Sequence, residues 1–231
     1  MKATGQIELE FRTWGGKRRR AGRKVKGRRK VAHRRRLEFA SRYPSHITLR
    51  FIDGLPSMRR GKAFKAVRAA MYVAMAHQGF RIVHLSIQRN HIHMICEADD
   101  RLALARGVQS FKISAAKRLN KMLGRDGTIF ADRYHSEILR TPTQVRNAIC
   151  YVLNNWRRHG EDRGATIRVD HFSTGYWFHG WKERGPLESV PSDVEVLPSC
   201  KAQTWLLEDG WRKAPPISLY DRPGQRPNAR A

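Results

Sequence analysis

Alternating hydrophobic patterns between residues 41 and 160 restrict the fold of this chain more than any other feature of its sequence. Four segments have the period of two that is typical of strands: 46–51, 81–88, 91–98 and 134–140. Two segments have the period of three to four that is typical of helices: 58–78 and 101–122. The order β-α-β-β-α-β predicts an α+β domain of the ferredoxin-like split βαβ type, with an antiparallel sheet that two helices cover on one face.

The two faces of this predicted sheet differ in composition. The residues expected to face the helices are apolar: Ile47, Leu49, Phe51, Val83, Leu85, Ile87, Ile92, Met94 and Cys96. The opposite face is polar and carries His46, Thr48, Arg50, His84, Ser86, Gln88, His91, His93 and Glu97. Contact with water would explain each polar residue alone. Four histidines and an arginine on one face indicate a function instead.

A third helix is predicted over residues 141–160. Thr141, Pro142 and Gln144 form a capping box with a proline at the first helical position. The apolar stripe of this helix is expected to consist of Val145, Ala148, Ile149, Val152 and Trp156. Asn147, Tyr151 and Asn155 form a polar line at the edge of that stripe, so Tyr151 should face the polar side of the sheet without being buried.

The polar residues of the predicted strand 91–98 and of the predicted helix 141–160 are together suited to one kind of reaction. His91 and His93, two residues apart on a strand, share a face and are candidate ligands of a metal ion, with Asn155 as a third ligand. Tyr151 is a candidate nucleophile. Taken singly, the histidines are more simply explained as strand residues, and the tyrosine as a packing residue. Together they favour phosphodiester transfer, which needs a Lewis acid and an oxygen nucleophile.

The charge of the chain favours a nucleic-acid partner. Forty-six lysines and arginines against 20 acidic residues give a formal net charge of +26, which calls for a polyanion. No run approaches the length of a spanning helix, and the N-terminus lacks the apolar core of a signal peptide, so we expect no membrane partner and a cytoplasmic, nucleoid-associated location. The candidate nucleic-acid-binding residues are Arg50, Lys112, Lys117, Arg118, Lys121, Lys17, Arg18, Arg19 and Arg20.

Composition divides the chain into three parts. Residues 1–40 are predicted to be a disordered basic arm, because 13 of the 20 residues from 17 to 36 are lysine or arginine. Residues 41–160 form the predicted catalytic domain. Residues 161–231 are an aromatic and proline-containing extension, which either folds back onto the domain or stacks on unpaired bases. Folding back is favoured, because tryptophan and phenylalanine belong to cores more often than to contacts.

Four short runs resemble the HUH single-tyrosine transposases, in particular the REP-associated tyrosine transposase-like proteins. They are YPSHITLR at 43–50, RNHIH at 89–93, FADRYH at 130–135 and YVLNN at 151–155. The resemblance implies that His91 and His93 hold a divalent ion, typically Mg²⁺ or Mn²⁺, that Tyr151 is the nucleophile, and that Asn155 occupies the third-ligand position. That position is often glutamine in related transposases, and Trp156 stands where relatives commonly have proline.

The activity implied by the resemblance is cleavage and rejoining of single-stranded DNA near imperfect hairpins. The tyrosine forms a 5′-phosphotyrosine link and leaves a free 3′-hydroxyl. Two alternatives remain open at this point: an inactive relative that only binds DNA, and an RNA-binding protein with the same fold. The sequence leaves open whether the chain acts as a monomer or as a homodimer.

Overall fold

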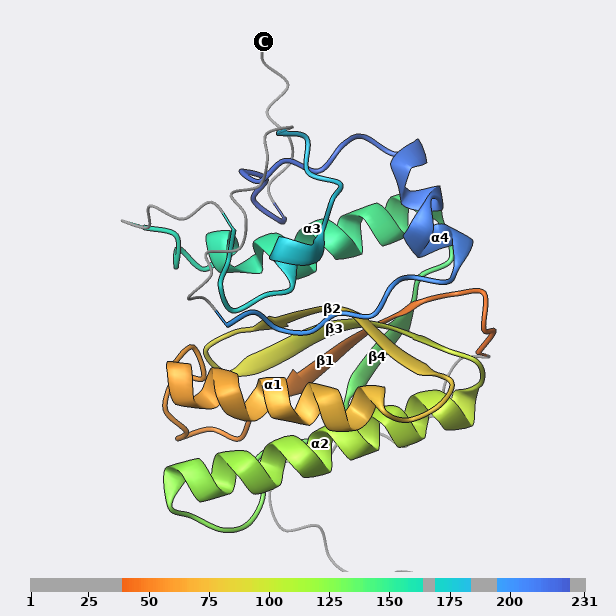
Figure 1. Cartoon of the computed structure of the whole chain (residues 1–231). Helices are drawn as coiled ribbons and strands as arrows, with labels where there is room; N and C mark the ends of the chain where they lie inside the picture. The colour runs from red at the N-terminus through yellow and green to blue at the C-terminus, as the bar shows by residue number, and fades with distance from the viewer. Residues whose placement is uncertain (1–38, 164–168, 184–194, 225–231) are drawn as a thin grey trace, which may run out of the picture. The chain divides into compact units, whose positions relative to one another are not determined.

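The computed structural model describes residues 39–163, 169–183 and 195–224. Its centre is a four-stranded antiparallel sheet with the strand order β2-β3-β1-β4 (Figure 1). The strands are β1 Ser45–Arg50, β2 Phe80–Ile87, β3 His91–Ala98 and β4 His135–Ile138, and the long helices are α1 Gly61–Met75, α2 Arg101–Leu123 and α3 Pro142–Arg158. This order confirms the predicted ferredoxin-like α+β fold. The predicted arm, with Lys17, Arg18, Arg19 and Arg20, lies outside the described residues.

Helices α1 and α2 cover one face of the sheet (Figure 1). The apolar residues of β1 and β3 are buried against them, as predicted. Gly107 permits close contact between α2 and the start of β2, since a Cβ added there would lie 2.1 Å from Cγ of Phe80. Any larger residue at this position would therefore force α2 away from the sheet.

Strand β2 departs from the predicted alternation at Val83. Its pairing with β3 shifts between Ile82 and His84, so Val83 is an extra residue in a β-bulge. Val83 consequently packs in the core beside α3, whereas the pattern placed it with Leu85 and Ile87. That assignment was wrong because a bulge moves one residue to the other face of the sheet.

Two elements are shorter than their patterns predict. Helix α1 begins at Gly61 rather than at Met58, because the Met58 N–H donates to the carbonyl oxygen of Arg89 at 3.0 Å and its side chain is buried. This contact holds the segment before α1 against the β2–β3 turn. Strand β4 spans only His135–Ile138 of the predicted 134–140.

Helix α3 covers the opposite face of the sheet, together with two C-terminal segments (Figure 1). The predicted capping box is present, with Thr141 accepting from the Gln144 N–H and the Gln144 side chain accepting from the Thr141 N–H. The C-terminal segments contain the short helices η1 Gly175–Trp177, α4 Trp205–Glu208 and η2 Gly210–Lys213. Their apolar residues pack with α3 in a second core: Val169, Phe178, Trp181, Leu206, Leu207, Trp211, Ile217 and Leu219. These residues fold back over α3, and the polar face of the sheet is covered over most of β2 and β3.

The same C-terminal segments cover the free edge of β2. The Thr174 N–H donates to the Leu85 carbonyl at 2.9 Å, and the Cys200 N–H donates to the Ile82 carbonyl at 2.9 Å. The Ile87 N–H donates to the Phe172 carbonyl at 2.8 Å. An exposed edge strand is a template for unwanted pairing, and these bonds occupy it.

Two buried carboxylates attach the C-terminal segments to the domain. Asp170 accepts two hydrogen bonds from the Arg59 guanidinium, at 2.8 and 2.9 Å. Glu97, fully buried on β3, accepts from the backbone N–H groups of Gln203 and Thr204 and pairs with Arg81. A buried carboxylate that lost these partners would strongly destabilise the folded protein. The two carboxylates therefore favour this one position of the C-terminal segments.

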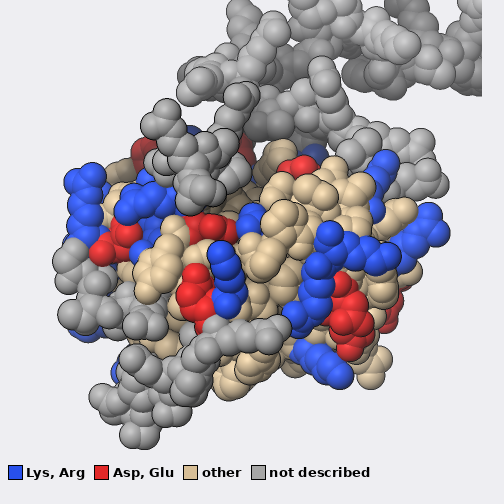
Figure 2. Space-filling view, turned by 90° about the horizontal axis from the view of Figure 1, so that it is seen from above, with Lys and Arg blue, Asp and Glu red and all other residues tan. Residues whose placement is uncertain are grey.

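The surface over α3 and the C-terminal segments carries both signs of charge. Figure 2 shows lysine and arginine side chains beside acidic ones on this face. Several pairs join α3 to the chain that follows it, including Arg146 with Asp221 at 2.8 Å and Arg157 with Asp162 at 3.1 Å. Among the helices of the described ranges, none has the length and apolar character needed to cross a bilayer.

Candidate functional site

The central strands β1 and β3 bring three histidines and a threonine together on the enclosed polar face. In the antiparallel register Thr48 lies opposite His93, and Arg50 lies opposite His91. Residues two apart on a strand share a face, so His46 and Thr48 stand beside His91 and His93. The ring centroids of His91 and His93 are 4.5 Å apart, and those of His46 and His93 are 5.2 Å apart.

His93 is held from one side of its ring. Its Nδ1 lies 3.1 Å from Thr48 Oγ1 and 3.2 Å from His46 Nε2. Burial, followed by the proximity of His91 and His46, lowers the pKa of His93 to about 2. Burial and then the proximity of His135 lower the pKa of His46 to about 4. Both rings are therefore neutral at pH 7.

The other ring nitrogen of His93 is buried without a partner. Nε2 makes no hydrogen bond to any described residue. A neutral imidazole that donates from Nδ1 to Thr48 or His46 carries its lone pair on Nε2. In this tautomer His93 presents the nitrogen form that binds a metal ion, and its two neighbours fix the orientation of the ring.

His91 has a similar arrangement nearer the surface. Its Nδ1 lies 2.8 Å from Oδ1 of Asn90, which is an acceptor only, so Nδ1 donates and Nε2 carries the lone pair. Burial, followed by the proximity of His159 and Arg50, lowers the pKa of His91 to about 4. His91 is thus also neutral at pH 7 and able to act as a ligand.

Helix α3 places Tyr151 over the two inner histidines. The Tyr151 ring centroid is 4.9 Å from that of His93 and 5.8 Å from that of His46. The side chain is half-buried, as predicted. One end of the helix also supplies a cation, since the guanidinium carbon of Arg158 lies 5.7 Å from the Tyr151 ring centroid.

Asn155 is buried more deeply than its predicted place at the edge of the stripe. The side chain is completely buried, and neither Oδ1 nor Nδ2 has a hydrogen-bond partner in the described chain. Tyr151, one turn before it, contacts His93, and His159, one turn after it, lies 5.9 Å from His91 between ring centroids. Asn155 lies between Tyr151 and His159 on the same side of the helix, so it faces the histidine pair.

These donors fit a divalent ion. Across residues 39–163, 169–183 and 195–224, no three His, Cys, Asp or Glu side chains form a group that could hold a metal. A site here must therefore include another residue type, and the amide oxygen of Asn155 is a suitable ligand. The set contains two imidazole nitrogens and one oxygen. Because Mg²⁺ prefers oxygen ligands, this set suits Mn²⁺ better than Mg²⁺.

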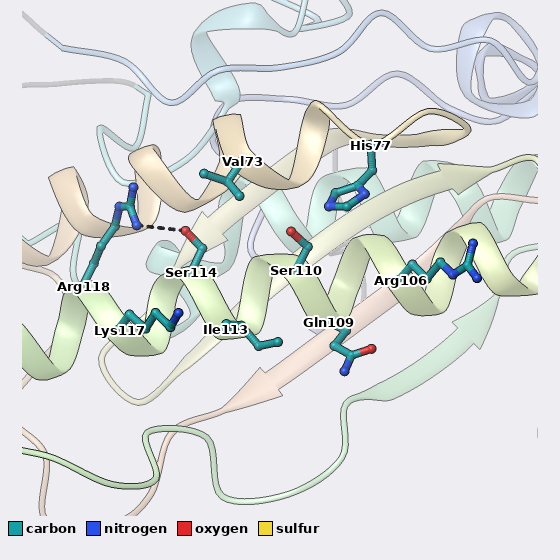
Figure 3. Close-up of a pocket in the computed structure, with 9 residues that line it drawn as sticks. All are labelled: Val73, His77, Arg106, Gln109, Ser110, Ile113, Ser114, Lys117 and Arg118. Carbon is teal, nitrogen blue, oxygen red and sulfur yellow. Dashed lines mark hydrogen bonds between the residues drawn. The ribbon is translucent and has the colours of Figure 1, made fainter.

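The predicted nucleic-acid-binding residues are distributed over both faces of the sheet. Arg50 is the last residue of β1 and pairs with Asp53 at 2.9 Å. Lys112 donates to the carbonyl oxygen of Asp132 at 3.0 Å. Lys117 and Arg118 line a groove between α1 and α2 with a volume of about 500 Å³ (Figure 3).

Lys121, in the last turn of α2, is exposed, as are Lys117 and Arg118. Helix α2 lies on the face of the sheet opposite α3 (Figure 1). The basic residues of α2 therefore do not lie with Tyr151. Any role that they have in binding DNA is separate from the site of the chemistry.

Sequence reasoning identified the residues of this site but not the contacts among them. His46 and Thr48 were placed on the polar face, yet their bonds to His93 depend on a register that joins residues 45 or more positions apart. Arg158 and His159 were missed altogether. Their position about two turns beyond Tyr151 on an amphipathic helix was the available signal.

Part of the domain matches a model of a known protein family. Residues 57–155 match the family model described as Transposase IS200 like. This segment includes His91, His93, Tyr151 and Asn155, so the part of the domain that carries them is similar to the IS200-like transposases.

Among solved structures, one match is described as the REP-associated tyrosine transposase bound to a REP hairpin. It is 19% identical to this chain, with a TM-score of 0.46, and the match covers 56% of this chain and 75% of that chain. No curated protein sequence matches the chain.

Proposed function

We propose that this protein cleaves and rejoins single-stranded DNA through a covalent 5′-phosphotyrosine intermediate on Tyr151. The observation that carries the proposal is the position of the Tyr151 ring, 4.9 Å from His93, whose Nε2 is buried and unpaired. A nucleophile beside an available Lewis-base nitrogen is the arrangement that metal-assisted phosphodiester transfer requires.

Three residues would hold the divalent ion: His91 and His93 through Nε2, and Asn155 through Oδ1. When bound, the ion would polarise a non-bridging phosphate oxygen and orient the phosphate. His46 and Thr48 keep the His93 ring in the tautomer that this role requires. Mn²⁺ or Mg²⁺ is the expected ion.

The transfer step conserves the number of phosphodiester bonds. The Tyr151 hydroxyl oxygen forms a bond to phosphorus, and the bond from phosphorus to the 3′-oxygen breaks. The phenolic proton leaves the nucleophile, and the departing 3′-oxygen takes up a proton to become a free hydroxyl. Arg158, whose guanidinium carbon lies 5.7 Å from the Tyr151 ring centroid, would favour the negative charge that develops on the phenol. Attack by a 3′-hydroxyl reverses the step, so ATP is not needed.

The expected substrate is an unpaired strand with a nearby hairpin. Tyr151 is half-buried between α3 and the sheet, so a phosphate must enter this layer, and a flexible single strand can do so more easily than a stiff duplex. Hairpin recognition is the expectation that the family resemblance implies. The exposed cations of α2 are available for a stem at a distance from the cleaved bond.

Covalent capture of DNA tests this proposal. A 5′-labelled and a 3′-labelled single-stranded oligonucleotide that each bear a hairpin are incubated with protein and Mn²⁺, and adducts are separated on a denaturing gel. We expect an adduct that carries the DNA downstream of the cut, and its loss in Tyr151→Phe and in excess EDTA. Tyr72→Phe, which changes an exposed tyrosine of α1, is the matched control.

The outcomes separate the alternatives. An undiminished adduct in Tyr151→Phe would remove this residue from the mechanism. Binding of the hairpin oligonucleotide with no adduct under any divalent ion would support the rival reading, a protein that binds nucleic acid without cutting it. Equal cleavage of a perfect duplex, or cleavage of RNA, would contradict the proposed substrate.

A further inference from the structure

The polar layer under α3 contains a cluster of unpaired buried atoms. In the described chain, eight buried side-chain nitrogen or oxygen atoms lack a hydrogen-bond partner. Four of them belong to three residues of this layer: His93 Nε2, Asn155 Oδ1 and Nδ2, and Gln88 Oε1. An unpaired buried polar atom costs roughly 1–3 kcal/mol, so a cluster of them points to a ligand that binds there.

Gln88 belongs to this cluster through the geometry of the β2–β3 hairpin. Its N–H donates to the His91 carbonyl at 2.9 Å, so Gln88 and His91 stand opposite each other. Ser86, two residues earlier on the same face, is paired with His93. The Gln88 side chain reaches back to Ser86, where Nε2 donates to Oγ at 3.3 Å. Its amide group therefore lies along the histidine pair.

The amide group of Gln88 has a nitrogen that makes a hydrogen bond and an oxygen that makes none. Nε2 is used by Ser86, and Oε1, with two lone pairs, is buried without a partner. The side chain is only 1% exposed, so water outside the protein does not reach it. A carbonyl oxygen enclosed in this way is a ligand that both Mn²⁺ and Mg²⁺ accept.

We propose that Gln88 is a further protein ligand of the cation site, binding the divalent ion through Oε1 with His91, His93 and Asn155. The inference rests on the proposed function, because it concerns the ion assigned there. It adds a second amide oxygen, from the residue that follows β2, whereas the first amide oxygen comes from Asn155 on α3. The four donors are neutral, so the ion retains its full positive charge for the DNA phosphate.

Binding of Mn²⁺ to the full-length protein without DNA tests this inference, with free Mn²⁺ measured by electron paramagnetic resonance. Gln88→Met keeps the length of the side chain and removes the oxygen, and we expect it to raise the Kd for Mn²⁺ about tenfold or more. Gln88→Glu supplies an anionic oxygen at the same place and should lower that Kd at least severalfold. Gln109→Met, at an exposed position of α2, should leave it unchanged.

His93→Ala separates failure of the inference from failure of the proposed function. If His93→Ala weakens Mn²⁺ binding while both Gln88 variants bind as the wild type does, Gln88 is not a ligand and the rest of the site stands. If wild type and His93→Ala bind Mn²⁺ equally, the cation site and the inference both fail. Should Gln88→Met not fold, Gln88→Glu decides alone, and an unchanged Kd in that variant overturns the inference.

Discussion

Helices cover both faces of the sheet, but the two faces are built from different residues. The face under α1 and α2 is an apolar core that includes Ile47, Leu49 and Phe111. The face under α3 encloses His84, His93 and other polar groups, several of them without hydrogen-bond partners. Hydrophobic burial stabilises the first face, whereas the polar groups of the second face are costly to bury. One sheet thus has a face that maintains the fold and a face that is available for chemistry.

The difference between the two faces indicates where mutations can separate stability from activity. Removing apolar volume from the α1–α2 face should destabilise the protein and spare the chemistry of any molecules that remain folded. Removing one of the unpaired polar groups from the α3 face should affect the chemistry more than the stability, because an unpaired buried atom contributes no stabilising bond.

The largest effect is expected from His93→Ala. Formation of the DNA adduct should fall at least 100-fold, because the variant loses a proposed ligand beside Tyr151. The unfolding free energy should fall by only about 1–3 kcal/mol, because the variant loses the Nδ1 contacts to Thr48 and His46 while the Nε2 that is lost has no partner. Gel detection of the adduct and urea unfolding measure the two quantities. A variant that unfolds but retains adduct formation would contradict the division between the faces.

Phe111→Ala should have the reverse effect. Phe111 is completely buried under α2, and its truncation should lower the unfolding free energy by about 3–5 kcal/mol. The adduct formed per folded molecule should stay within a few-fold of wild type. Ile113→Ala, at an exposed position of the same helix, is the control and should change stability by less than about 1 kcal/mol.

Acid should destabilise the protein through the polar face. Burial lowers the pKa of His84 to about 4, below its value of 6.5 in an unfolded chain. Between these values the unfolded state binds more protons, so stability that is present above pH 6.5 is lost as the pH falls toward 4. Wild type should lose about 3 kcal/mol more than His84→Gln between pH 7 and pH 4. Urea unfolding across this range, with the exposed His77→Gln as control, measures the difference.

The smallest effect concerns the part of the affinity for single-stranded DNA that comes from residues 17–20, which belong to neither face of the sheet. Changing Lys17, Arg18, Arg19 and Arg20 together to glutamine should weaken binding to single-stranded DNA and reduce the salt dependence. Each cation that contacts a phosphate contributes about 0.7 to the slope of log K against log salt. The choice of cleavage site should be retained, because phosphate contacts do not read sequence. Fluorescence anisotropy at several salt concentrations provides the slope, and a changed cleavage site would show that these residues read bases.

Local sequence patterns were sufficient for most of the fold. The capping box of Thr141 and Gln144 and the alternation of β1 and β3 are determined within a few residues, and both were predicted correctly. The bulge at Val83 was not, because a shift in pairing depends on the partner strand. The complete burial of Asn155 was also missed. It depends on the sheet and on residues after 168, which cover α3 but have no periodic pattern of their own.

The sequence predicted which residues form the candidate site, but not which of them contact one another. Spacing alone placed His91 with His93, and Tyr151 with Asn155, on common faces. The bonds from Thr48 and His46 to His93 required knowledge of which strands are neighbours. The position of Gln88 beside His91 required the hairpin register as well. Contacts across strands are set by the tertiary structure, which a single segment does not contain.

The enclosure of α3 has a consequence for how DNA strands would be exchanged. One side of this helix packs on the sheet, and the other side packs on Trp181, Trp211 and their apolar neighbours. Ion pairs from Arg146 and Arg157 fasten it further. A helix held from both sides stays with the histidines of its own domain throughout a reaction cycle. Joining one DNA end to another therefore requires the DNA strands to exchange positions while the tyrosine stays in place. The movement is made by the nucleic acid and not by the helix.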